Sequence, residues 1–121
     1  MDIRPLLREE LVHENGVDAK RLVPWPELNA PFEGGWVVVS PGSASGSHSH
    51  HEYEIFIAMS GEAELESAGE RRPFREGDIV RFPPHTDHRV INEGADEFKF
   101  YCVWWDTDMS ERFVARHAEG A

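Results

Sequence analysis

Cysteine is almost absent from this sequence of 121 residues, which contains Cys102 alone. A single cysteine excludes an intramolecular disulfide, so the fold has to be stabilised by burial of apolar surface. Cys102 lies in the aromatic run from Phe98 to Trp105. Because a cysteine in such surroundings usually behaves as a small hydrophobic residue, we predict a packed strand residue here rather than a nucleophile.

Long hydrophobic runs are also missing. The longest, Ile55 to Met59, has the length of a strand and is far too short to cross a membrane. The first residues, Met1 to Pro5, lack the apolar core of a signal peptide. We therefore expect a cytoplasmic protein.

Basic residues are scarce relative to acidic ones. Twelve Lys and Arg stand against 23 Asp and Glu, which gives a formal net charge of −11 at pH 7. That much negative charge repels phosphate backbones and anionic lipid surfaces. We therefore expect neither a nucleic acid nor a membrane as a partner of this chain.

The chain has the length of one domain, and turn residues divide most of it into short segments. Strands are predicted at residues 36–39, 53–59, 62–66, 78–82, 88–92 and 97–105. Many short strands at close, regular spacing favour an all-β sandwich or barrel. Short helices are predicted at residues 4–14 and 109–117, with an extended arm as the alternative to the first.

Five of the seven histidines fall into two groups, each just before a predicted strand. They are His48, His50, His51, His85 and His88. Side chains at i and i+2 of an extended segment face the same side, so His48 and His50 project together, and Glu54 has the same parity. An inward-pointing His88 would complete a set of three imidazoles and one carboxylate. Such a set suits zinc, iron, manganese, nickel or copper rather than magnesium or calcium.

Two stretches of the sequence resemble the two motifs of the cupin superfamily. The first is Gly42, five residues, His48-Ser-His50, three residues, Glu54, six residues and Gly61. The second is Gly77, five residues, Pro83, one residue, His85, two residues, His88, three residues and Asn92. Nine of these ten fixed positions agree with the family pattern. The departure is His85, which stands where the family usually has Gly.

The resemblance implies an all-β fold, the cupin double-stranded β-helix or jelly-roll barrel, with short helical segments near the termini. It predicts an N-terminal arm and first extended strands at residues 1–30, the barrel at 31–108, and a short helix or tail at 109–121. It also implies one divalent transition metal inside the barrel, with zinc or iron expected first and manganese or nickel as alternatives. Its implied ligands are His48, His50, Glu54 and His88. Small cupins often pair through their sheets, so the resemblance further implies a homodimer.

Two further residues are predicted to take part in catalysis. His85 places a titratable group at the barrel mouth, where it would donate to a substrate or transfer a proton near neutral pH, or would only narrow the entrance. Arg81 has the opposite parity to its strand neighbours and would bind an anionic group of a substrate. His51 is expected to face solvent. Either the Phe98 face or the Lys99 face of the last strand should line the cavity, and the sequence does not decide between them.

Open positions on a metal held by three His and one Glu predict a metal-dependent enzyme acting on a small organic molecule. A looser resemblance, in His48 to Gly61 and Val103 to Asp106, is to small cupins paired with methionyl-tRNA-synthetase-like proteins in hydrazine biosynthesis. It implies a zinc-dependent rearrangement that forms an N–N bond in an aminoacyl ester made by the synthetase-like partner. The other alternative is a non-catalytic cupin that binds or senses a small ligand.

Overall fold

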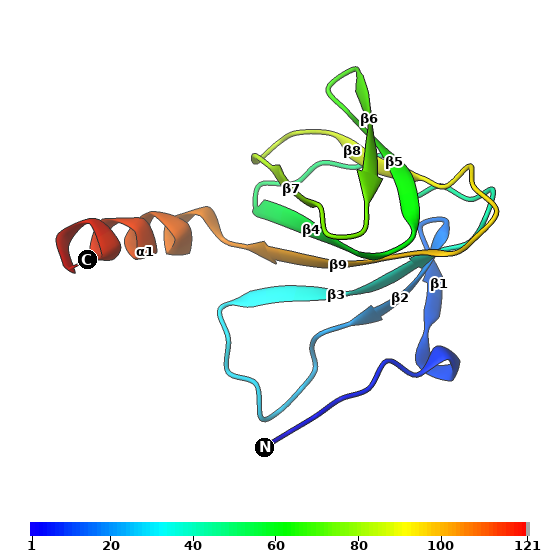
Figure 1. Cartoon of the computed structure of the whole chain (residues 1–121). Helices are drawn as coiled ribbons and strands as arrows, with labels where there is room; N and C mark the ends of the chain where they lie inside the picture. Colours follow the sequence, from blue (N-terminus) through cyan, green and yellow to red (C-terminus); the bar gives the residue numbers. More distant parts are fainter. Residues whose placement is uncertain (121) are drawn as a thin grey trace.

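The computed structural model describes residues 1–120, and it describes the side chains of residues 1–118. Nine antiparallel strands form two sheets that face each other across the core, with a helix at the C-terminal end (Figure 1). The six-stranded sheet has the order β1-β2-β3-β9-β4-β7, with strands Val12–Glu14, Val17–Arg21, Phe32–Val39, Phe98–Trp105, Tyr53–Ser60 and Ile79–Phe82. The three-stranded sheet has the order β6-β5-β8, with strands Glu70–Arg75, Glu62–Ser67 and His88–Ile91.

The core lies between the sheets because alternate residues of each strand turn inward. Along β4 the inward side chains are Glu54, Phe56 and Ala58, all buried. On β9 the buried face carries Phe98, Phe100 and Cys102, which settles the question that the sequence left open. Cys102 is 8% exposed and its thiol donates to the carbonyl oxygen of Gly35, so the predicted packed strand residue is confirmed.

The predicted strands and the all-β barrel are confirmed, but the helix predicted at residues 4–14 is wrong. That segment contains only a 3₁₀ turn, Arg8–Glu10, followed by strand β1. The hairpin turn at Asn15 and Gly16, with φ of 52° and 81°, pairs β1 with β2. An Asn-Gly turn of this kind is a strong hairpin signal, and strand pairing therefore outweighs the weak helical pattern. The alternative of an extended arm is the better description.

A second hairpin changes the interpretation of the arginine-rich segment after Gly69. Residues 70–75 form strand β6, paired along its length with β5, although this segment is not among the strands predicted from the sequence. The turn between the two strands lies at Ala68 and Gly69, whose φ angles are 51° and 77°. Phe74 is the buried residue of β6, while Arg71 and Arg72 are exposed.

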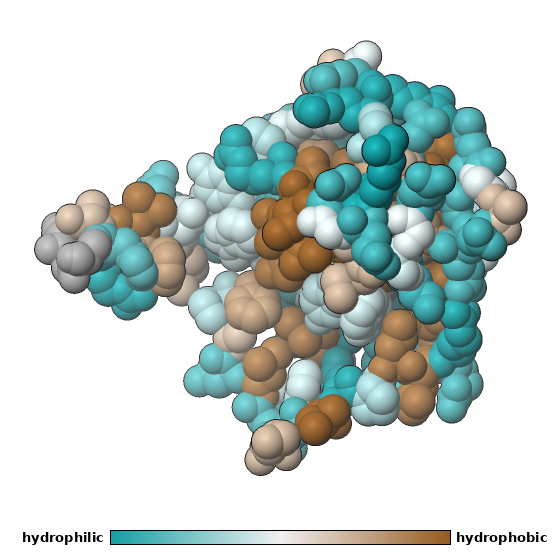
Figure 2. Space-filling model, in the orientation of Figure 1, coloured by the Kyte–Doolittle hydropathy of each residue, from teal (hydrophilic) through white to brown (hydrophobic). Residues whose placement is uncertain are grey.

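Helix α1 (Thr107–Gly120) begins two residues before the predicted start and extends away from the barrel in continuation of β9 (Figure 1). Hydrophobic side chains lie on its surface (Figure 2), and among them Phe113 and Val114 are more than half exposed. The predicted C-terminal segment 109–121 ends at Ala121, which lies outside the described residues. No helix in the described part of the chain is long and apolar enough to cross a membrane.

Candidate metal centre

The four predicted metal ligands come together at the end of the barrel where the two sheets meet. His48 and His88 face each other through a pair of backbone hydrogen bonds, at N–O distances of 3.3 and 3.1 Å. Glu54 extends inward from β4, and His50 lies in the loop that leads into that strand. One ligand atom from each of the four lies within 4.8 Å of the others. The structure therefore contains the group that the spacing predicted, and this group could hold a metal ion.

Glu54 and His88 are the buried half of the group. Glu54 is 3% exposed and His88 is 1% exposed, whereas His50 is half-buried and His48 is exposed. Phe82 stacks on the His88 ring at 4.2 Å between centroids, and Phe56 meets it edge-on at 5.5 Å. These contacts fix the orientation of the His88 ring and leave the group accessible from the side of His48.

The hydrogen bonds of two histidines determine which ring nitrogen carries a lone pair toward the centre. The Nδ1 atom of His88 lies 2.9 Å from the carbonyl oxygen of Thr86, which can only accept, so Nδ1 carries the proton. The Nδ1 atom of His48 is placed in the same way, 3.3 Å from the carbonyl oxygen of Gly46. In the neutral form of either ring, Nε2 is then the unprotonated nitrogen. This second-sphere arrangement is the one that prepares imidazoles for metal binding.

When the His88 ring is neutral, its Nε2 directs a lone pair at a carboxylate oxygen. It lies 2.8 Å from Oε1 of Glu54, yet it makes no hydrogen bond within the described residues. The same oxygen also lies 3.0 Å from Nε2 of His50, whose buried Nδ1 lies 3.4 Å from Oε1 of Glu52 without forming a hydrogen bond to any described residue. Two acceptors this close repel each other unless a cation lies between them. A proton would satisfy one pair, whereas a divalent cation would satisfy all four ligand atoms, so the residues present fit a metal.

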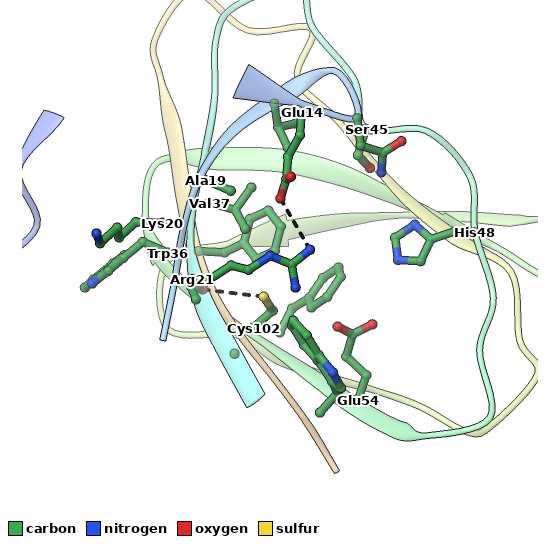
Figure 3. Close-up of a pocket in the computed structure, with 17 residues that line it drawn as sticks. Glu14, Ala19, Lys20, Arg21, Trp36, Val37, Ser45, His48, Glu54 and Cys102 are labelled. Carbon is green, nitrogen blue, oxygen red and sulfur yellow. Dashed lines mark hydrogen bonds and ion pairs between the residues drawn. The ribbon is translucent and has the colours of Figure 1, made fainter. Parts of the chain in front are cut away.

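A cavity of about 290 Å³ opens beside the group (Figure 3). His48 and Glu54 form its metal-ligand side. Strands β2, β3 and β9 supply much of the rest, including Phe100 and Trp104 of β9, and Phe56 of β4 completes the apolar wall. Burial raises the pKa of the Cys102 thiol to about 12, with the charge of Glu54 as the next cause. Cys102 is therefore protonated at neutral pH and contributes an apolar wall rather than a nucleophile.

The structure does not bring the predicted Arg81 to the cavity. Its side chain is exposed on β7, where its Cα is paired with that of Ile55, and it is absent from the described lining. Opposite parity to Phe82, whose ring packs on His88, turns Arg81 away from the centre. Its predicted catalytic role is thus without geometric support.

His85 is close to the group through its backbone rather than its side chain. Its N–H donates to the carbonyl oxygen of His50 at 2.7 Å, and its side chain is exposed. Its φ is 61°, in the left-handed region that favours glycine, which explains why the motif usually has Gly there. His51 is also exposed, as expected, and is not a member of the group. A catalytic role for His85 stays a prediction.

Two charged residues with no predicted role border the cavity beside the ligand group: Glu14 at the end of β1 and Arg21 at the end of β2. Glu14 had been assigned to a helix. Arg21 lies shortly before Pro24 and Pro26 and falls outside the strands predicted individually from the sequence. The Asn15-Gly16 dipeptide was the available signal, because it predicts a hairpin that places both residues on neighbouring strands.

The sequence profile of the cupin domain family matches residues 35–104. The chain is 56% identical to a cupin 2 conserved barrel domain protein from Salinispora arenicola; the alignment covers 97% of this chain and 98% of that one, with a TM-score of 0.85. It is 38% identical to the plu4264 protein from Photorhabdus luminescens, over 98% and 99% of the two chains, with a TM-score of 0.84. It is also 31% identical over 64 residues to the oxalate-binding protein of Thermotoga maritima, which is 52% of this chain and 53% of that relative's length.

Proposed function

The chain belongs to the cupin domain family, and we propose that it is a metal-dependent enzyme acting on a small organic molecule in the barrel cavity. One observation carries the proposal: three imidazoles and a carboxylate converge within 4.8 Å beside a cavity of about 290 Å³. A structural metal is normally enclosed by its four protein ligands, whereas a catalytic metal keeps a position open toward substrate. Here the His48 and Glu54 side of the group borders the cavity, which favours the open kind of site.

The residues of this chain would hold the metal, orient its ligands and exclude water from the cavity. His48, His50, Glu54 and His88 would hold the metal, which when bound supplies Lewis-acid polarisation of a substrate oxygen or activation of water or dioxygen. The backbone carbonyl groups of Gly46 and Thr86 hold two of the imidazoles in the ligating tautomer. Phe56, Phe100 and Trp104 form apolar walls that reduce the water around a bound substrate.

Zinc or iron is the metal that this donor set supports best, with manganese or nickel as alternatives. Three neutral nitrogen donors favour these transition metals over magnesium and calcium, which prefer oxygen donors. The single carboxylate leaves a net charge of +1 on a divalent centre. Such a centre attracts anionic or polar oxygen donors.

Metal analysis of protein purified without added metal tests the proposal. We expect about one metal ion per chain, lost in His48→Ala and in Glu54→Ala because each change removes one of four ligands. His51→Ala is the matched control, since His51 is exposed and lies outside the group. Unchanged metal content in both ligand variants would contradict the proposal.

A non-catalytic binding protein is the second candidate, and one comparison favours it. The Thermotoga maritima relative is named for binding oxalate. The two functions differ in what happens to the ligand. Incubating the metal-loaded protein with oxalate and a panel of small carboxylates, followed by mass spectrometry, distinguishes them. Ligand that binds in calorimetry and is recovered unchanged supports binding, whereas a product that depends on Glu54 supports an enzyme.

The other sequence-based expectations remain proposals. A zinc-dependent N–N bond-forming rearrangement would require a synthetase-like partner, and co-purification with such a protein is its test. A homodimer is tested by the molar mass in solution. A cytoplasmic location is tested by fractionation of the source cells.

A further inference from the structure

Arg21 brings a positive charge into the cavity that borders the metal-ligand group. It is the last residue of β2, and its Cα is paired with that of Gly35 on β3. Figure 3 shows its guanidinium directed into the cavity, between Glu14 and Glu54. Lys20, the preceding residue, is drawn pointing away, and its Nζ lies 3.3 Å from Glu10. Arg21 is thus the side chain in this part of β2 that can meet a bound ligand.

The Arg21 guanidinium is positioned without being fully engaged. Its Nη2 lies 3.6 Å from Oε1 of Glu14, where the charges attract but the distance is too long for a good hydrogen bond. Its Cζ lies 5.9 Å from the centroid of the Trp104 ring, at the outer limit of a cation–π contact. Both contacts orient the side chain, and neither uses its N–H donors.

Other arginines of the chain are engaged differently. Arg8 donates twice to Glu97, at 2.8 and 2.6 Å, and Arg71 donates at 2.6 Å to Glu64 and to Glu93. Those donors are occupied by the protein's own carboxylates. Arg21 is 58% exposed in its side chain and has donors available for a planar acceptor.

The charges of both Arg21 and Glu54 affect the pKa of the Cys102 thiol. Burial is the main cause of its raised pKa; the charge of Glu54 raises it further, and the charge of Arg21 lowers it. Both charged groups therefore act on one atom in the cavity wall. This agrees with the view in Figure 3, where Arg21 and Glu54 approach the cavity from different strands.

We infer that Arg21 binds a carboxylate of the ligand while another part of the same ligand faces the metal-ligand group. The inference rests on the proposed function and names its substrate class: a small molecule that carries a carboxylate. A guanidinium matches a carboxylate through two parallel N–H···O hydrogen bonds. A single guanidinium with Glu14 beside it suits a ligand with one negative charge. A phosphate dianion would be repelled more strongly by Glu14 and Glu54.

The size of the cavity limits the ligand further. Pockets for small molecules commonly measure about 300–1,000 Å³, so a cavity of about 290 Å³ lies at the lower end. The lining has apolar walls formed by Phe56, Phe100 and Trp104, and its other cationic side chain, Lys20, points away from the cavity. Discrimination between a carboxylate and its uncharged amide therefore depends on Arg21.

A pair of hydroxamates tests carboxylate binding by Arg21 in zinc-loaded protein. Succinic monohydroxamic acid and its carboxamide analogue share the metal-binding hydroxamate and differ in the charge of the distal group. We expect the carboxylate form to bind about tenfold more tightly to the wild-type protein by calorimetry. Arg21→Gln should abolish or invert that preference, because the remaining charges of Glu14 and Glu54 repel the anion. Arg21→Lys should keep part of the preference for the carboxylate form. Glu14→Gln should increase that preference above the wild-type value.

Chelator-treated protein separates this inference from the metal proposal. Butanoate is expected to shift the Nε–Hε NMR signal of Arg21 saturably, and butanamide is not. The signal is assigned by its loss in Arg21→Gln, and Arg72→Gln on the exposed β6 strand is the matched control. Failure to bind zinc contradicts the proposed function alone. Equal binding of charged and uncharged probes in both forms of the protein, or a preference that survives Arg21→Gln, overturns the role of Arg21.

Discussion

The backbone N–H of His85 donates a hydrogen bond to the carbonyl oxygen of His50, with 2.7 Å between nitrogen and oxygen. This bond joins the two loops that carry the metal-ligand group, and His85 adopts a φ of 61° to make it. A left-handed conformation costs a residue with a Cβ roughly 1–2 kcal/mol, part of which glycine recovers. The hydrogen bond therefore requires a left-handed backbone at residue 85, and it does not require the imidazole side chain.

His85→Gly is expected to stabilise the protein by about 0.5–1 kcal/mol, because glycine adopts the left-handed region without steric cost. The larger chain entropy that glycine loses on folding offsets the rest of the relieved strain. Chemical denaturation measures the change. His85→Ala is the control, since it keeps the strain and removes the imidazole. If both variants have the same stability, the backbone explanation fails. Separately, if His85→Gly and His85→Ala each turn over an identified substrate at the wild-type rate, the predicted catalytic role of His85 fails.

Metal removal is expected to lower the melting temperature by roughly 10 °C in protein previously held at about a hundredfold excess of free metal over its dissociation constant. The physical reason is linkage: the ion binds the folded group and not the unfolded chain. Calorimetric scans before and after chelation measure the shift. His50→Ala should lack it, whereas His51→Ala, one residue away and exposed, should retain it. A full shift in His50→Ala would contradict the assignment.

Cys102 should make stability sensitive to alkaline pH. Its folded pKa is raised to about 12 from an ordinary value of 9.0, so the folded state retains a proton that the unfolded chain loses first. This contribution is fully present below pH 9.0 and is lost as pH rises toward 12, by at most roughly 1.4 kcal/mol per pH unit. Denaturation curves across this range measure it. Cys102→Ala should fall less steeply over the same interval, and an identical slope would contradict the burial argument.

Asn92 is a structural residue of the second motif. It is fully buried, donates to the carbonyl oxygens of Val39 and Asp96 at 2.9 Å, and accepts from the N–H of Gly94 at 3.0 Å. Asn92→Ala is expected to cost about 2–3 kcal/mol of unfolding free energy, because buried partners lose their hydrogen bonds. Asn92→Asp should cost more, since it loses the amide donors and buries a charge.

Denaturant titration measures both Asn92 variants. Asn29→Ala, at an exposed asparagine, is the control and should stay within about 0.5 kcal/mol of wild type. A neutral Asn92→Ala would show that water replaces the amide, and Asn92 would then have no structural role.

The metal-ligand group could be predicted because the residue spacings that define it lie within two short stretches of the sequence. The i, i+2 spacing of His48 and His50 and the spacing of the two motifs are readable without knowing how strands pair. The approach of Arg21 to Glu54 was not readable in this way. It depends on β2 pairing with β3 and β3 with β9, contacts between segments far apart in sequence. The inward face of β9 likewise depends on which sheet the strand joins.

Helix α1 has a further consequence for measurement. A helix of 14 residues has little stability of its own in water, and most helices in proteins are stabilised by packing. Because α1 projects from the barrel (Figure 1), its helicity is nearly independent of the barrel fold. Among the described residues the barrel contains no other α-helix, so the helical part of the 222 nm circular dichroism signal reports on α1, above a constant contribution from strands and aromatic side chains. Any change of that signal with protein concentration measures the contacts that α1 makes with another molecule.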